Sequence, residues 1–162
     1  MVLSEIEQGI KRKIETTGVP LKNWGIKISR GILTGCNEAF IIDGDTRNRL
    51  IKEDPKSAEI IRPILRGRDI KRYGYVFKDL WLITSHNGYK SEGQKIPPVD
   101  IGLYPVVKAH LDQYWKEISK RGDRGITPYN LRNCAYMDDL DRQKIIWGEL
   151  SDLPKFTFDV EG

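Results

Sequence analysis

A segment dense in cations, IIRPILRGRDIKRY at residues 60–73, carries the strongest chemical signal in this sequence. Its basic residues are Arg62, Arg66, Arg68, Lys71 and Arg72. Arginine presents a planar fork of hydrogen-bond donors, which fits phosphate oxygens and the O6/N7 edge of guanine. Asp69 lies among these cations and could hold two of the guanidinium groups in fixed directions. The segment favours nucleic-acid binding, and the alternative is a solvated, charged turn that follows a helix.

A second candidate segment precedes the first one in the chain. Residues 32–37, ILTGCN, are expected to join two strands through a loop rich in glycine, threonine and asparagine. Such a loop lets the backbone approach a ligand closely and supplies short hydrogen-bonding groups. The alternative is a plain connection within a β-hairpin.

Sequence motifs that mark enzymatic sites are absent. The chain has no P-loop, no GxSxG, no HExxH and no GxGxxG pattern. A metal-dependent nuclease could be assembled from Asp43, Asp54 and Lys56, because the last two have the acid-x-Lys spacing. However, Pro55 and the capping pattern place Asp54 and Lys56 at the start of a helix. The nuclease is therefore kept only as an alternative.

Several helices are predicted from caps and apolar spacing. Residues 4–7, SEIE, have the pattern of a capping box, and Ile6, Ile10 and Ile14 follow at helical spacing. They predict a first amphipathic helix, whose narrow stripe favours covering a core or docking on a neighbour. Asp45 is expected to cap a short helix up to residue 51, and Asp54 to cap another that carries the apolar residues from position 60 to 65.

The longest predicted helix spans residues 104–121. Pro105 lies in its first turn, and apolar residues recur at one helical face, namely Val107, Leu111, Tyr114, Trp115 and Ile118. Strands are predicted at residues 24–29, 39–42, 81–84, 144–147 and 156–158, with loops at 87–100 and 122–136. The expected fold is α+β, with short twisted antiparallel sheets, flanking helices and the long helix lying across one sheet.

Composition narrows the class of protein. The 162 residues carry 27 Lys and Arg against 23 Asp and Glu, a formal net charge of +4, so a polyanion is attracted only if the cations collect on one face. Cys36 and Cys134 form no metal-binding pattern and are expected as small core residues in a reducing cytoplasm. No signal peptide and no membrane-spanning run is recognised.

Three blocks together resemble one protein family. They are GILTGCNEAFIID, IIRPILRGRDIKRY, and YPVVKAHLDQYWKEISKRGDRGITPYNLRNCAY continuing through KIIWGELS. Their order and spacing resemble the TaqI-like C-terminal specificity domain, the target recognition domain of bacterial and archaeal restriction-modification enzymes. The resemblance covers the chain from about Trp24 to Phe158. It implies an N-terminal helix or linker at residues 1–20 and a target recognition domain at 21–162.

The resemblance implies a DNA-binding protein that reads a short duplex site and presents it to a separate adenine-N6 DNA methyltransferase domain. Such a domain, covalently linked or associated and sometimes joined to a nuclease, would hold S-adenosylmethionine and, for the nuclease, Mg²⁺. This chain lacks the Asn-Pro-Pro-Tyr or Asp-Pro-Pro-Tyr motif of the methyltransferase, so no cofactor and no catalysis are expected in it. The end at FTFDVEG comes early for the family, which implies an excised piece.

The contacts with DNA are expected from three groups of residues. The cationic segment would contribute Arg66, Arg68, Lys71 and Arg72. The glycine-threonine-asparagine loop would contribute Arg30, Thr34 and Asn37. The later loops would contribute Lys90, Arg121, Arg124, Tyr129 and Arg132. Lys and Arg contacts to phosphates would give affinity, and contacts to base edges would give specificity.

A rival hypothesis is a protein-interaction domain that docks on a methyltransferase or nuclease and barely touches DNA. The isoleucine stripe of the first helix favours it. A steep fall of DNA affinity with salt would argue against it.

Overall fold

The computed structural model describes residues 3–148 and 153–160 of this chain. Residues 149–151, which end the KIIWGELS block, lie outside the described part. The chain separates into two compact units, residues 1–31 and 32–162, and each is described by itself. The functional division after residue 20 remains a prediction.

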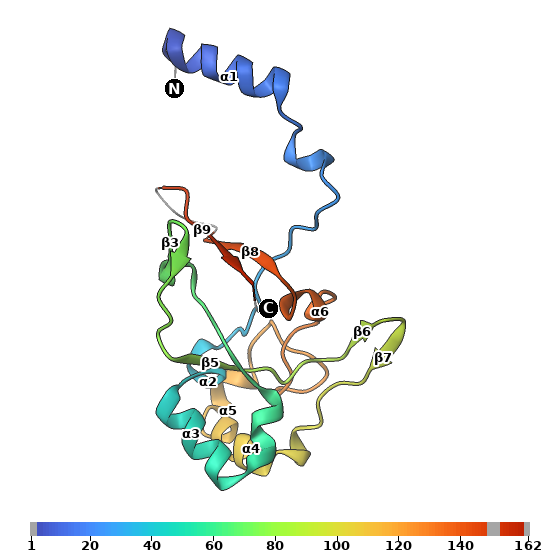
Figure 1. Ribbon diagram of the computed structural model, residues 1–162. Coiled ribbons are helices and arrows are strands. Elements are labelled where there is room, and N and C mark those ends of the chain that lie inside the picture. Colours follow the sequence, from blue (N-terminus) through green and yellow to red (C-terminus); the bar gives the residue numbers. More distant parts are fainter. Residues whose placement is uncertain (1–2, 149–152, 161–162) are drawn as a thin grey trace. The chain divides into compact units, whose positions relative to one another are not determined.

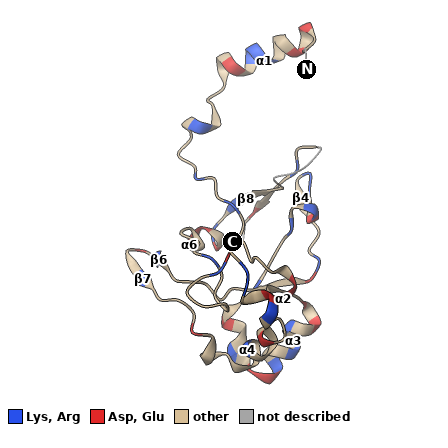
Figure 2. Ribbon diagram, turned by 180° about the vertical axis from the view of Figure 1, so that it is seen from behind, with Lys and Arg blue, Asp and Glu red and all other residues tan. Residues whose placement is uncertain are grey.

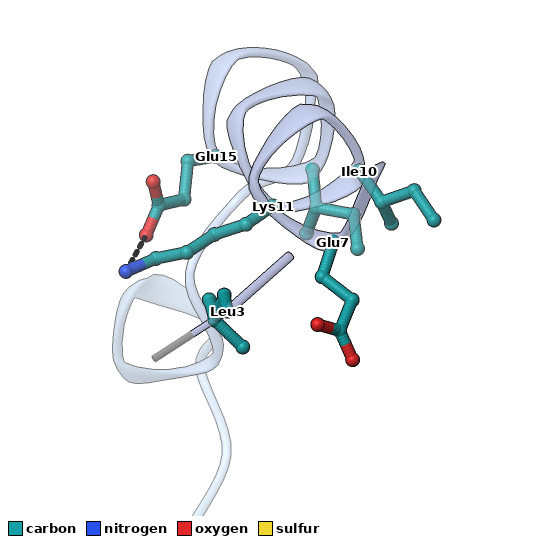
Figure 3. A pocket seen from close by; sticks show the side chains of 6 residues that line it. Leu3, Glu7, Ile10, Lys11 and Glu15 are labelled. Carbon is teal, nitrogen blue, oxygen red and sulfur yellow. Dashed lines mark ion pairs between the residues drawn. The ribbon is translucent and has the colours of Figure 1, made fainter. Parts of the chain in front are cut away.

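The first unit is built on α1 (Glu5–Thr17), labelled in Figure 1. The Ser4 side chain accepts from the Glu7 amide at 3.4 Å, and the Ser4 amide donates to the Glu7 carboxylate at 2.8 Å. These two bonds satisfy amide groups that a helix start leaves without partners, so the predicted capping box is confirmed. A shallow hollow along α1 is lined by Leu3, Glu7, Ile10, Lys11, Ile14 and Glu15, with an ion pair between Lys11 and Glu15 at 3.7 Å (Figure 3).

The predicted strand at residues 24–29 is wrong. After a short 3₁₀ turn, η1 (Leu21–Asn23), this stretch pairs with no strand, and Trp24, Ile26 and Ile28 are exposed. Alternating apolar residues form a strand only where a neighbouring strand takes up the backbone hydrogen bonds and a core covers one face. Neither condition is met within this unit.

The second unit centres on a three-stranded antiparallel sheet. Its middle strand is β5 (Leu80–Ile83), which pairs with β1 (Ile41–Asp43) and β2 (Ile61–Pro63). The register places Ile42 opposite Trp81 and Ile61 opposite Ile83. The apolar run at 81–84 is thus confirmed as a buried strand, because both of its neighbours supply hydrogen bonds and apolar contacts.

Short helices cover this sheet and complete the core. They are α2 (Asn37–Phe40), α3 (Gly44–Glu53), η2 (Pro55–Ile60), η4 (Ile101–Leu103), α4 (Pro105–Asp112) and α5 (Trp115–Ile118). The largest fully buried apolar side chains of the shared core are Phe40, Leu50, Ile83, Leu111, Ile118 and Leu131. Cys36 packs against this core, and both cysteines are half-buried free thiols.

Three local predictions around the sheet need correction. Residues 37–40 form helix α2, so the predicted strand 39–42 shortens to β1. Asp43, not Asp45, caps α3 by accepting from the Thr46 amide at 2.8 Å. The helix expected up to residue 65 is only the 3₁₀ turn η2, because its apolar residues are drawn into pairing with β5 as β2.

The long helix predicted at 104–121 is divided into α4 and α5. The amides of Gln113 and Tyr114 bond to carbonyls three residues back, at 3.3 and 3.0 Å, instead of four. This tighter turn separates α4 from α5, and Val107, Leu111 and Ile118 are all buried in the core, as the apolar spacing predicts.

Three two-stranded antiparallel sheets complete the second unit, together with α6 (Met137–Leu140). They pair β3 (Ile70–Lys71) with β4 (Gly74–Tyr75), β6 (Tyr89–Ser91) with β7 (Gln94–Ile96), and β8 (Lys144–Trp147) with β9 (Phe156–Asp159). The predicted strands near the end of the chain are confirmed, whereas the predicted loop 87–100 contains a hairpin. The fold is α+β, as expected. No helix in the described part combines the length and the apolar content needed to cross a membrane.

Candidate nucleic-acid interface

The cationic segment forms a small structure that we call the basic hairpin, residues 66–75. It comprises η3 (Gly67–Asp69), β3 and β4. Ile70 is buried and lies opposite Tyr75, and the Val76 amide donates to the Asp69 carbonyl at 2.9 Å. A buried anchor and a paired backbone therefore fix the positions from which the neighbouring cations project.

Arg66 and Asp69 form the internal support of the basic hairpin. Arg66 donates to the Asp69 carboxylate through Nε at 2.9 Å, Nη2 at 3.3 Å and its backbone amide at 3.2 Å. The hydrogen bond from the Arg66 side chain lowers the pKa of Asp69, although burial of the carboxyl opposes this. The donors of Arg66 are thus bonded to Asp69, and this interaction stabilises the conformation of the hairpin.

Three other cations of the basic hairpin remain exposed. They are Arg68, Lys71 and Arg72, and none forms an ion pair with a carboxylate among residues 3–148 and 153–160. Within the described part of the chain, the Lys71 ammonium donates to the Arg68 carbonyl, at 3.4 Å. Figure 2 shows basic residues in blue on the hairpin labelled β4. A polyanion would meet these charges without first displacing a paired carboxylate among the described residues.

Tyr73 stands at the turn of the basic hairpin and is 81% exposed. Its φ of 67° lies in the left-handed region, where a bulky residue is strained unless its surroundings hold it. The Arg72 guanidinium lies 5.1 Å from the centre of the Tyr73 ring. An exposed ring with a stacked cation is a surface suited to nucleotides.

The basic hairpin is attached to the β8–β9 hairpin. The Tyr73 amide donates to the Phe156 carbonyl at 2.9 Å, and this bond holds the strained turn. Gly67 and Gly148 approach closely, since a Cβ built on Gly148 would lie 3.2 Å from the Gly67 carbonyl oxygen. Figure 1 shows β3 beside β9. The basic hairpin that carries the exposed cations is therefore supported by the β8–β9 hairpin.

A second basic element is the β6–β7 hairpin, which we call the lysine ribbon. Lys90 and Lys95 are exposed and directly opposite each other in the register. Like charges in this position repel each other and destabilise a strand pair. Gly93 (φ 83°) and Glu92 (φ 48°) form its turn. A two-stranded ribbon has a width that the major groove of DNA admits, and phosphates would relieve the repulsion.

Arg121 and Thr34, two predicted contacts, are buried. Arg121 is only 7% exposed, and its guanidinium lies 4.4 Å from the centre of the Phe40 ring. It donates to the carbonyls of Thr34, Asp123, Pro128 and Asn130. The Thr34 hydroxyl donates to the Asn37 side chain at 2.6 Å. These groups join the loops to the core, and Arg121 offers no open donor face to a phosphate.

The remaining predicted contacts are dispersed. Arg124 donates to the Ser119 carbonyl at 2.9 Å, and Arg132 pairs with Asp123 at 3.1 Å. The Tyr129 hydroxyl donates to Asp112 at 2.5 Å, and burial together with this bond raises the pKa of Tyr129. Arg30 is exposed in the first unit. Within the second unit, the partners of Arg124, Arg132 and Tyr129 given above all lie outside the basic hairpin.

Sequence reasoning misses two residues of the candidate interface. The position of Lys95 could have been predicted, because the residues on either side of Glu92-Gly93 have a pattern typical of a β-hairpin. Such a hairpin would place Lys95 opposite Lys90. Tyr73 carries no such signal, because its positive φ and its backbone bond to Phe156, which is distant in the sequence, are not apparent from the neighbouring residues.

The acids proposed for a nuclease have structural partners. Asp43 accepts from the Thr46 amide, and Asp54 accepts from the Lys56 amide at 3.1 Å. Both carboxylates therefore cap separate helical turns. The described residues contain no cluster of three or more histidine, cysteine or acidic side chains that could hold a metal ion.

Comparison of the chain with protein-family models and with curated proteins found no match. The function is therefore argued from the residues and their geometry.

Proposed function

We propose that this chain is a DNA-binding specificity module that grips duplex DNA and reads a short site. The observation that carries the proposal is the set of exposed cations Arg68, Lys71 and Arg72 on a rigidly held hairpin, with no paired carboxylate among the described residues. Other cations, such as those of Arg132 and Lys144, are neutralised by acids. Arg68, Lys71 and Arg72 thus keep unneutralised charge on a hairpin whose backbone is paired.

The two basic elements have different parts in this proposal. The basic hairpin contacts phosphates, which supplies affinity and makes it sensitive to salt. The lysine ribbon enters the major groove, where Lys90 and Lys95 approach phosphates on either side and the neighbouring Gln94 reaches base edges. Glutamine pairs well with adenine in that groove, so the ribbon is the element that contributes specificity.

The chemistry that follows recognition belongs, in this proposal, to a separate domain. The resemblance of residues 24–158 to the TaqI-like specificity domain supports an adenine-N6 DNA methyltransferase, joined or associated, and sometimes a nuclease. That domain would hold S-adenosylmethionine and any Mg²⁺, and the pair would act in the cytoplasm. The present chain contributes binding and orientation of the duplex.

A triple variant tests the basic hairpin. We expect R68A/K71A/R72A to bind a duplex at least about tenfold more weakly and to flatten the salt dependence by about 0.9 for each phosphate that is no longer neutralised. Fluorescence anisotropy across a range of salt concentrations measures both quantities. The matched control is K52A/K116A/K120A, which removes the same charge from exposed sites elsewhere. Equal weakening in the two triple variants would refute the assignment.

A docking module is the second candidate function, and the exposed isoleucine stripe of α1 favours it. In that case DNA affinity would be weak and would change little with salt. Selection of binding sites from random duplex DNA at two salt concentrations separates the candidates. A recovered consensus supports the specificity module, whereas random recovered sequences support docking.

A further inference from the structure

One face of the β8–β9 hairpin is apolar and open. In the register, Ile145 lies opposite Phe158 and Trp147 opposite Phe156. Because alternate residues of a strand point to the same side, these four side chains share one face, which we call the aromatic face. Their exposed fractions lie between 41% and 59%. The rings of Trp147 and Phe156 are 6.5 Å apart and inclined by 41°.

The opposite face of the same hairpin already has its partners. Thr157 is buried there, and the Lys144 ammonium pairs with Asp159 at 2.6 Å. Lys144 also donates to the Leu140 carbonyl at 2.6 Å. The hairpin therefore packs through its polar side, and it presents its apolar side to solvent, the reverse of the usual order for an amphipathic strand pair.

The neighbour of the aromatic face identifies its occupant. The turn of the basic hairpin is bonded to Phe156 through Tyr73, so exposed cations and exposed rings adjoin each other. A ligand that satisfies both must combine anionic groups with flat apolar surfaces. Nucleotides have this combination, but the bases of an intact duplex hide their faces in the stack. Bases outside a duplex expose them.

We infer that the aromatic face binds unpaired DNA bases by stacking while the basic hairpin holds their phosphates. This inference rests on the proposed function, and it adds a second substrate, DNA whose bases have left the stack beside the recognised site. Aromatic side chains stack with any base, so the contact is independent of sequence. The site then retains a distorted duplex more tightly than an intact one.

The experiment compares three fluorescent probes, a short duplex, the same duplex with a central bubble of unpaired thymines, and the single strand. We expect the wild-type chain to bind the bubble more tightly than the duplex. Trp147→Leu and Phe158→Leu retain apolar volume but remove a flat ring, and each is expected to reduce that preference about tenfold. Both are expected to bind the intact duplex as the wild type does.

Trp115→Leu is the matched control, since it removes an exposed indole from α5 in the same unit and should retain the preference for the bubble. Circular dichroism verifies folding, and Phe158→Leu serves if Trp147→Leu unfolds. Equal affinity of the wild type for bubble and duplex would overturn the inference alone, because duplex binding through the basic hairpin would persist. Loss of a dimer in sedimentation for Trp147→Leu, with the bubble preference unchanged, would assign the face to a second copy and also overturn it.

Discussion

Arg66 and Arg121 show how the environment decides what an arginine does. The sequence predicts a DNA contact for both, yet Arg66 donates to a buried carboxylate and Arg121 to four backbone carbonyls. Burial lowers the pKa of Arg121, because a charged guanidinium loses solvation in the core. The residue type sets the bonds that are possible, and the acceptors nearby determine which bonds form.

We predict that Asp69→Asn destabilises the second unit by about 1–3 kcal/mol at neutral pH, because it weakens the bonds from Arg66. The pKa of Asp69 is lower in the folded protein than in the unfolded chain. The carboxylate therefore stabilises the fold above the unfolded pKa of about 3.9, and this contribution disappears as the pH falls towards the folded-state pKa.

The difference between wild type and Asp69→Asn should consequently shrink below about pH 4. Urea denaturation at several pH values measures it. The control is Asp141→Asn, which changes an exposed carboxylate. A difference that stays constant down to low pH would show that the charge of Asp69 is not what stabilises the hairpin.

Arg121→Lys tests the buried guanidinium. Lysine keeps the charge, but its single ammonium cannot reach carbonyls spread around a planar fork. We expect the free energy of unfolding to fall by about 3 kcal/mol, since several buried carbonyls are left without donors. Chemical denaturation measures the change, with the exposed Arg132→Lys as control. An unchanged stability would contradict the structural role of Arg121 and favour a surface role.

Elements follow the sequence where local and tertiary preferences agree. The capping box begins α1, and the apolar run at 81–84 becomes the middle strand β5. Elements differ from the sequence prediction where pairing with another strand is possible. Residues 61–63, for example, are expected in a helix but form strand β2. The stretch 24–29 has a strand pattern without a partner strand. The apolar pattern of a segment shows which face it could bury. Whether that face is buried depends on the elements that pack against it in the fold.

The candidate site follows the same division. Arg68, Lys71 and Arg72 are accessible to sequence reasoning, because a dense charge run stays at the surface in most folds. Thr34 and Arg121 are not, since their burial depends on loops that are distant in the chain meeting at Phe40. The hydrogen bond between Tyr73 and Phe156 also joins residues that are distant in the sequence, so neither local pattern predicts it.

In the lysine ribbon, the same two charges that would attract DNA also destabilise the strand pair. Lys95→Glu replaces a repulsive cross-strand pair with an attractive one facing Lys90, so we expect stability to rise by up to about 1 kcal/mol. In the same variant we expect DNA affinity to fall, because attraction to a phosphate becomes repulsion. Thermal denaturation and anisotropy give the two readouts. A variant that is both more stable and an equally good binder would exclude the ribbon from the interface.

Although the net positive charge of the whole chain is modest, the electrostatic potential can be strongly positive at one part of its surface. The 27 basic and 23 acidic residues nearly balance, but pairing is uneven. Lys108 and Arg132 form ion pairs with carboxylates. Arg68, Lys71 and Arg72 of the basic hairpin have no paired carboxylate among the described residues. A polyanion responds to this distribution rather than to the sum.

The contact between the Gly67 and Gly148 backbones has a practical corollary for engineering. A side chain at position 148 would place its Cβ 3.2 Å from the Gly67 carbonyl oxygen, so the Gly67 backbone would have to shift by a few tenths of an ångström to admit it. Grafting residues 66–75 alone onto another scaffold would leave the tyrosine turn without its anchor. Residues 66–75 and 144–160 must be transplanted together, as a single cassette.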